Sequence, residues 1–247
     1  MWKLLQLRRE QGRQAIADLR TARPEGFRGL PVIATTPCAE GCQACVDVCP
    51  TAAITAPPAQ LDLGRCTLCG ACAPACPSGK IAFTTQTAMA ASERTALVVS
   101  EGPARIPDVD IGAALRARFG RSLKLRQVSA GGCNGCELEL NALANVNFDI
   151  GRHGIEWVAS PRHADALVVS GPITKTMADA VQLAWDAMAE PRFVIAVGAC
   201  AISGGLYDGA PGVDRGFFDR QPPLIYVPGC PPHPLTIARA LLMALGR

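Results

Sequence analysis

Eight of the twelve cysteines of this 247-residue chain fall into two similar runs near the N-terminus. The two runs are Cys38-x3-Cys42-x2-Cys45-x3-Cys49-Pro50 and Cys66-x2-Cys69-x2-Cys72-x3-Cys76-Pro77. Cysteine thiolates with this spacing hold pairs of [4Fe–4S] clusters, and the fourth cysteine of each run binds the cluster of the other run. The spacing therefore predicts a protein that transfers electrons.

The crossed pattern assigns four thiolates to each of the two clusters. The first cluster takes Cys38, Cys42, Cys45 and Cys76, and the second cluster takes Cys66, Cys69, Cys72 and Cys49. A pair of zinc sites is the alternative, because C-x2-C pairs also suit tetrahedral zinc. The proline after the fourth cysteine of each run favours iron–sulfur clusters. Three residues separate Cys38 from Cys42, where two are usual, which puts the geometry of the first cluster in question.

Composition changes along the chain and predicts two domains with flanking segments. The predicted divisions are an N-terminal arm (1–30), a ferredoxin-like domain with two [4Fe–4S] clusters (31–85), a connector (86–107) and an α/β domain (108–247). The segments CPTAAI and CPSGKIAF indicate an internal repeat in which a turn leads into a short apolar strand. Residues 95–100 of the connector are strand-like, and their pairing partner is not predicted.

Helical and strand periodicities alternate from residue 108 onward. Strands are predicted at 123–128, 155–159, 166–170, 193–197 and 224–227, and helices at 111–119, 137–145, 178–189 and 235–245. Such alternation is typical of a parallel sheet covered by helices. The predicted fold class is α/β, with a flavodoxin-like parallel sheet preceded by a small α+β domain that holds two clusters.

The remaining four cysteines all follow predicted strands. Cys133 and Cys136 follow the strand at 123–128, Cys200 follows the strand at 193–197, and Cys230 follows the strand at 224–227. Open α/β sheets bind ligands at the carboxyl ends of their strands. Four thiolates at this edge predict a third [4Fe–4S] cluster, whereas the alternative is four structural cysteines that reach the edge by chance.

Glu137 follows Cys136 at the predicted start of a helix. One interpretation is an acid in the first helical turn, where the helix dipole stabilises negative charge. The other is a carboxylate beside a redox centre that relays protons. The sequence leaves both interpretations open.

Charge and apolar pattern bear on the location of the chain. A formal net charge of +3 with 18% charged and 5% aromatic residues argues against a nucleic-acid-binding surface. Residues 1–14 lack the uninterrupted apolar core of a signal peptide, so a reducing cytoplasm is expected. The N-terminal arm mixes apolar and basic residues, which predicts a short amphipathic helix on a membrane or partner surface, or an arm packed on its own domain. These residues are Trp2, Leu4, Leu5 and Leu7 with Lys3, Arg8, Arg9 and Arg13.

Four segments of the second half carry a family resemblance. GGCNGCELE, SPRHADALVVSGPITK, FVIAVGACAISGG and VPGCPPHP resemble the small, cluster-bearing subunit of energy-converting group 4 membrane-bound [NiFe]-hydrogenases, including formate hydrogenlyase and carbon-monoxide-linked types. That subunit is related to the 20 kDa subunit of respiratory complex I, which has two adjacent cysteines where this chain has Cys133-x2-Cys136. The resemblance covers residues 118–247 and implies that Cys133, Cys136, Cys200 and Cys230 hold the proximal cluster. Residues 31–85 resemble the separate two-cluster subunit of the same complexes, which makes the chain similar to a fusion of the two.

The resemblance implies a non-catalytic electron-transfer subunit with three [4Fe–4S] clusters. Electrons would pass to or from the [NiFe] site of a separate large subunit, in H2 evolution or oxidation. The implied partners also include membrane antiporter-like subunits and a donor such as formate dehydrogenase, carbon monoxide dehydrogenase or ferredoxin. The implied location is cytoplasmic and peripheral, on the inner face of the cell membrane as part of a complex. Two alternatives are a subunit of a complex I-like quinone-reducing assembly and a zinc-stabilised assembly scaffold.

Overall fold

One five-stranded parallel sheet organises the second half of the chain in this computed structural model, which describes residues 2–247. Its strands are β6 (Leu123–Ser129), β7 (Ile155–Trp157), β8 (Ala166–Ser170), β9 (Phe193–Val197) and β10 (Ile225–Val227). They pair in the order β10-β9-β8-β6-β7, and every pair is parallel. In chain order this is 2-1-3-4-5, which is the flavodoxin-like arrangement. The predicted fold class is confirmed.

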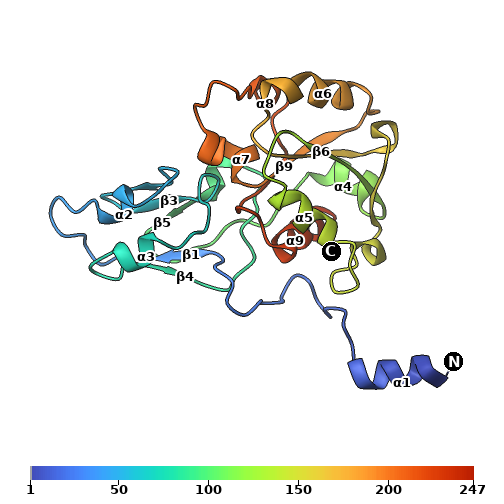
Figure 1. Cartoon of the computed structure of the whole chain (residues 1–247), viewed down its shortest axis with the longest axis horizontal. Coiled ribbons are helices and arrows are strands. Elements are labelled where there is room, and N and C mark those ends of the chain that lie inside the picture. Colours follow the sequence, from blue (N-terminus) through green and yellow to red (C-terminus); the bar gives the residue numbers. More distant parts are fainter. Residues whose placement is uncertain (1) are drawn as a thin grey trace.

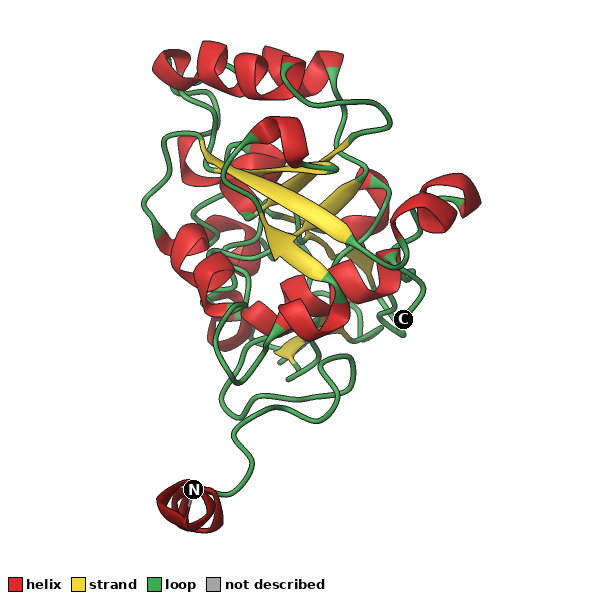
Figure 2. Cartoon of the chain, turned by 90° about the vertical axis from the view of Figure 1, so that its right-hand side faces the viewer, coloured by secondary structure: helices red, strands yellow, loops and turns green. Residues whose placement is uncertain are grey.

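Helices cover both faces of this sheet (Figure 2). They are α4 (Ala113–Phe119), α5 (Gly135–Ala142), α6 (Lys175–Asp186), α7 (Ala199–Ser203), α8 (Gly216–Arg220) and α9 (Pro234–Ala244). Alternate side chains of β8 enter different apolar clusters: Val169 packs with residues of α6 and α8, and Val168 packs with residues of α4, α5 and α9. Strands buried on both faces require nearly continuous apolar runs, which is why β8 and β9 could be predicted to the residue.

The observed helices differ from the predicted ones at their ends. Helix α6 begins at Lys175 and ends at Asp186, three residues earlier at each end than predicted, and α5 begins at Gly135. Helices α7 and α8 were not predicted, because five residues are too few to show a helical period. Four short 3-10 helices were also not predicted: η1 (Arg94–Leu97), η2 (Ile150–His153), η3 (Pro161–His163) and η4 (Gly205–Tyr207).

The cysteine-rich part (residues 31–100) holds two small antiparallel sheets and two short helices. Strand β1 (Pro31–Ile33) pairs with β4 (Ile81–Phe83), and β3 (Gln60–Asp62) pairs with both β2 (Ile54–Thr55) and β5 (Val98–Ser100). The helices are α2 (Ala44–Asp47) and α3 (Cys72–Ala75). The strand-like run predicted at 95–100, for which no pairing partner was predicted, forms most of η1 and all of β5 in the structure. Strand β5 is an edge strand of its sheet.

The cysteine-rich part and the α/β part (residues 113–244) lie side by side along the long axis (Figure 1). One apolar cluster crosses between them and includes Leu61 and Met89 as well as Val169 and Phe217. Backbone bonds between Ala91 and Tyr226 also join the two parts. These contacts fix the relative position of the two parts, and the predicted domain boundaries remain a prediction.

The N-terminal arm begins with helix α1 (Trp2–Gln11), which extends away from the rest of the chain (Figure 1). None of its side chains is buried, and Trp2 is 82% exposed. The following residues pack on the α/β part: Leu19 is 1% exposed, and the Ile16 amide donates to the carbonyl of Asn147 at 2.9 Å. Within residues 2–247, no helix has the length and apolar character needed to cross a bilayer.

Candidate iron–sulfur sites

The first site is a cavity of about 220 Å³ in the cysteine-rich part. Its lining includes all four cysteines predicted for the first cluster, which are Cys38, Cys42, Cys45 and Cys76. The extra residue between Cys38 and Cys42 leaves both side chains on the cavity wall. One water takes up roughly 30 Å³ in the liquid, so the cavity has room for a group of several atoms.

The second site is a pocket whose lining includes residues of both sheets of the cysteine-rich part. It is lined by the four cysteines predicted for the second cluster, which are Cys49, Cys66, Cys69 and Cys72. Leu61 and Phe83 are among its apolar walls. Cys49 belongs to the first sequence run and Cys76 to the second, and each lies with three cysteines of the other run. The fold thus brings together the crossed sets.

The repeat in the sequence is also a repeat in hydrogen bonding. The Ala53 amide donates to Sγ of Cys49 at 3.2 Å, and the Lys80 amide donates to Sγ of Cys76 at 3.3 Å. In each case the donor lies four residues after the cysteine that crosses to the other site. Hydrogen bonds to ligand sulfurs stabilise negative charge, and they are one of the factors that set cluster potentials.

The third site lies at the carboxyl edge of the parallel sheet. Cys133 and Cys136 follow β6, with Cys136 in the first turn of α5, while Cys200 lies in α7 after β9 and Cys230 follows β10. Burial, and then the charges of Glu137, Cys200, Cys230 and Cys133, raise the pKa of the Cys136 thiol to about 12. A Cβ added at Gly135, next to Cys136, would lie 3.6 Å from Sγ of Cys133 and 3.7 Å from Pro231, which follows Cys230. The loops that carry these cysteines thus meet at this edge, as the strand-end argument predicts.

Two glycines allow the backbone to pass close to these sulfurs. Gly198 has φ +91°, and a Cβ added there would lie 2.6 Å from Sγ of Cys136. Gly205 has φ +56°, and a Cβ there would lie 3.2 Å from Sγ of Cys200. Glycine is the residue that adopts positive φ without steric cost. At both positions a larger residue would therefore strain the backbone and crowd the neighbouring sulfur.

Burial raises the pKa of at least one thiol at each of the three sites. It raises the pKa of Cys45 in the first site, raises that of Cys66 to about 12 in the second, and raises that of Cys200 to about 11 in the third. A metal core supplies the positive charge that deprotonates a coordinating thiol. Three sets of four soft sulfur donors therefore fit [4Fe–4S] clusters. Within residues 2–247, no three His, Cys, Asp or Glu side chains are placed together as ligands of one metal ion.

Glu137 is buried in the first turn of α5, with 8% of its surface exposed. Its Oε1 accepts a hydrogen bond from the Ser170 hydroxyl at 2.6 Å. Its charge also raises the pKa of both Cys136 and Cys200, after burial of each thiol as the largest cause. The position agrees with a first-turn acid, and the short contact with Ser170 at the end of β8 also provides a hydrogen-bonded neighbour for a proton relay.

Two basic residues at these sites were missed by the sequence analysis. Lys80 lines the first site and is only 3% exposed. Arg215 donates to the backbone carbonyls of Cys200, Ala201 and Ile202 at 2.9 to 3.1 Å. These bonds cap the C-terminal end of α7. A signal for Lys80 was present, because CPTAAI and CPSGKIAF place Ala53 and Lys80 at equivalent positions. Arg215 contacts residues 13 to 15 positions away through backbone oxygens, and no local motif marks it.

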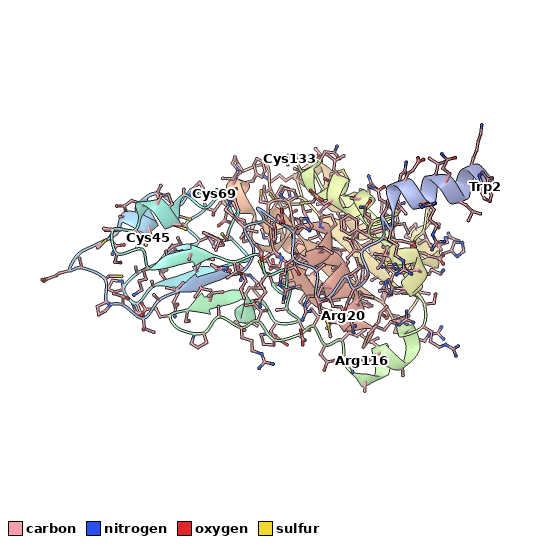
Figure 3. All side chains as sticks on the ribbon, turned by 90° about the horizontal axis from the view of Figure 1, so that it is seen from below. Trp2, Arg20, Cys45, Cys69, Arg116 and Cys133 are labelled. Atoms are coloured by element: carbon pink, nitrogen blue, oxygen red, sulfur yellow. The ribbon has the colours of Figure 1, made fainter. Side chains whose placement is uncertain are left out.

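The three sites follow one another along the long axis. Figure 3 labels one cysteine of each site, and Cys45, Cys69 and Cys133 occur in that order from the tip of the cysteine-rich part toward the α/β part. Figure 1 agrees, since α2 and α3 lie at the far end from α5. Cys133 is exposed, so the third site reaches the surface. The chain thus has two crossed sets of cysteines and a third set of cysteines at the edge of a parallel sheet. This arrangement is typical of an iron–sulfur protein that transfers electrons.

Comparison with known families gives the particular class. The family described as NADH ubiquinone oxidoreductase, 20 Kd subunit, matches residues 133–244. A 4Fe-4S dicluster domain matches residues 37–80.

Individual relatives are similar over about half of this chain. Formate hydrogenlyase subunit 7 of Escherichia coli (strain K12) is 40% identical over 134 residues, which cover 54% of this chain and 52% of that protein. The probable membrane-bound hydrogenase subunit mbhJ of Pyrococcus furiosus is 38% identical over 127 residues, which cover 51% of this chain and 76% of that protein. An NADH-quinone oxidoreductase subunit of Citrifermentans bemidjiense is 39% identical over 107 residues, which cover 43% of this chain and 62% of that protein.

The chain belongs to the family of the 20 Kd subunit of NADH ubiquinone oxidoreductase and carries a 4Fe-4S dicluster domain before it. This confirms the resemblance drawn from the sequence motifs. It also makes the chain a [4Fe–4S] protein.

Proposed function

We propose that this chain passes electrons through three [4Fe–4S] clusters to or from the [NiFe] site of a separate hydrogenase-type large subunit, in H2 evolution or oxidation. The observation that carries the proposal is the gathering of the cysteines into three sets of four, in a row that ends at an exposed edge of the sheet. The proposed ligands are Cys38, Cys42, Cys45 and Cys76 for the first cluster; Cys49, Cys66, Cys69 and Cys72 for the second; and Cys133, Cys136, Cys200 and Cys230 for the third.

The hydrogenase-type partner is supported by the relatives and by one spacing. Two relatives carry hydrogenase names, formate hydrogenlyase subunit 7 and the membrane-bound hydrogenase subunit mbhJ. Two residues separate Cys133 from Cys136, whereas the complex I subunit has adjacent cysteines at this position. A quinone-reducing partner is the second candidate, because an NADH-quinone oxidoreductase subunit is also a relative.

When bound, the clusters supply one-electron transfer, and the residues of this chain set where and how easily it occurs. Amides of Ala53, Leu68 and Lys80 donate to ligand sulfurs and so stabilise negative charge at the first two sites. At the second site, Cys66 and Cys72 are buried, whereas Cys69 is exposed. The exposed Cys133 is where the large subunit would cover the third site and exclude water.

The proposal extends to the remaining partners. The donor, such as formate dehydrogenase, carbon monoxide dehydrogenase or ferredoxin, would approach the first site at the far tip of the cysteine-rich part. Membrane antiporter-like subunits would hold the complex on the inner face of the cell membrane. The chain would then be cytoplasmic and peripheral.

Glu137 is the proposed proton relay beside the third cluster. A carboxylate buried next to a redox centre can exchange a proton when the charge of that centre changes. The Ser170 hydroxyl, 2.6 Å from Oε1, is its hydrogen-bonded neighbour. The first-turn acid remains the competing interpretation.

Purification of the tagged chain under anaerobic conditions, from the cells that make it, tests the proposed function. We expect a large partner subunit and nickel to copurify, and the complex to reduce a viologen dye with H2. The untagged strain is the control for nickel and for dye reduction. A nickel-free complex that reduces a quinone would contradict the hydrogenase-type function and support the second candidate.

A further inference from the structure

The two halves of the cysteine-rich repeat differ in charge at one buried position. Ala53 and Lys80 each lie four residues after a ligand cysteine, and each donates its amide to that cysteine's sulfur. Both residues are 3% exposed. The first half thus has a methyl group where the second half has an ammonium group.

The Lys80 ammonium is fixed by two partners inside the cysteine-rich part. Nζ lies 2.7 Å from Oε1 of Glu101 and donates to the Thr36 carbonyl at 2.6 Å. Glu101 also accepts from the Ala59 amide at 2.8 Å, which holds the carboxylate in place. A buried charge is tolerated where it is paired in this way.

Of the two partners in this ion pair, the lysine lines the cavity of the first site. Lys80 lines the first site together with Cys38, whereas Glu101 is not among the described residues that line it. The negative charge of Cys38 also raises the pKa of Lys80, after the larger effect of the hydrogen bond with Glu101. The positive end of the pair is therefore closer to the sulfurs than the negative end.

We propose that the Lys80 ammonium raises the reduction potential of the first cluster, so that the first cluster accepts an electron more readily than the second. This inference rests on the proposed function, in which Cys38, Cys42, Cys45 and Cys76 hold a [4Fe–4S] cluster. Reduction adds one electron to a centre that its four thiolates already make anionic. A nearby positive charge stabilises the added electron, and net charge and burial are among the factors that set cluster potentials.

The proposal predicts the order in which the clusters are reduced. The first site is at the far end of the row from the third site (Figure 3). A one-electron donor such as reduced ferredoxin loses one electron, and the first cluster gains it. When electrons pass toward the third site, the first cluster would then retain this electron at the end of the row where electrons enter.

Redox titration followed by EPR on the full-length protein tests the inference. Lys80→Met removes the positive charge, and we expect the equilibrium constant for one-electron reduction of the first cluster to fall about tenfold, which is about 59 mV toward lower potential. Glu101→Gln removes the negative charge and should shift the potential in the opposite direction. The double variant should lie between Lys80→Met and the unmodified chain.

Internal controls separate electrostatics from folding. The signal of the first cluster is identified by its loss in Cys42→Ser, and the potential of the second cluster should stay constant in every Lys80 and Glu101 variant. Shifts of the same sign in Lys80→Met and Glu101→Gln would overturn the inference, as would an unchanged potential in fully loaded Lys80→Met. If Lys80→Met loses its first cluster, the sign of the shift in Glu101→Gln and in the double variant decides. Absence of a first cluster from the unmodified chain would instead overturn the proposed function.

Discussion

Replacing Cys230 with serine is expected to remove the third cluster and to leave the first two in place. The other proposed ligands of the third site, such as Cys136 and Cys200, are positioned by β6 and β9, whereas the first two sites lie in the cysteine-rich part. A serine hydroxyl is a much poorer ligand for iron than a thiolate. Iron should fall by about one third, because one of three equal clusters is lost, and electron delivery to the large subunit should stop.

EPR spectra of the reduced protein check this expectation. Signals of the first and second clusters should survive in Cys230→Ser, and the signal of the third should vanish. Cys42→Ser is the matched variant, and it should remove only the first cluster. The two parts share an apolar cluster that includes Leu61 and Phe217, so loss of all three signals in Cys230→Ser would show that the sites are not independent.

Glu137→Gln is expected to lower H2 turnover of the assembled complex by about 10²-fold, which is typical for loss of a proton-transfer group. Glutamine keeps the shape of the side chain and an oxygen that can accept from the Ser170 hydroxyl. It cannot ionise, so it cannot take up and release a proton. Cluster content and reduction of the third cluster should remain unchanged, which the iron content and the EPR signal measure.

Glu139→Gln is the matched control, because it makes the same chemical change two residues further along α5. Its turnover should stay near that of the unmodified complex. If Glu137 is only a first-turn acid, its replacement should cost at most about 1 kcal/mol of dipole stabilisation. Normal turnover in a fully loaded Glu137→Gln complex would therefore reject the relay.

The cysteine sets were predictable because ligand geometry constrains spacing in the sequence. The repeated runs place Cys49 with one set and Cys76 with the other, and the structure lines its two pockets with those sets. The edge of the sheet was predictable because β8 and β9 are continuous apolar runs buried on both faces. Cysteines that follow parallel strands must then meet at one edge.

Other features depend on tertiary contacts, which a local sequence pattern does not show. Strand β5 has three residues, and only the folded chain shows that it pairs with β3. Helix α6 begins at Lys175 instead of residue 178, because apolar periodicity marks the buried face and not the first turn. The partner of Lys80 is Glu101, which lies beyond the whole of η1 and β5. Comparison of the two repeat halves marks the lysine, but it does not identify its partner.

The metal content of the anaerobically purified chain tests the central claim most directly. In the proposed assignment, the twelve cysteines form three sets of four and hold three clusters. We therefore predict about twelve irons per chain, a similar amount of acid-labile sulfide and almost no zinc. Three sets of four thiolates would also suit zinc chemically. Stoichiometric zinc with little iron would contradict the electron-transfer function and support the zinc-stabilised scaffold.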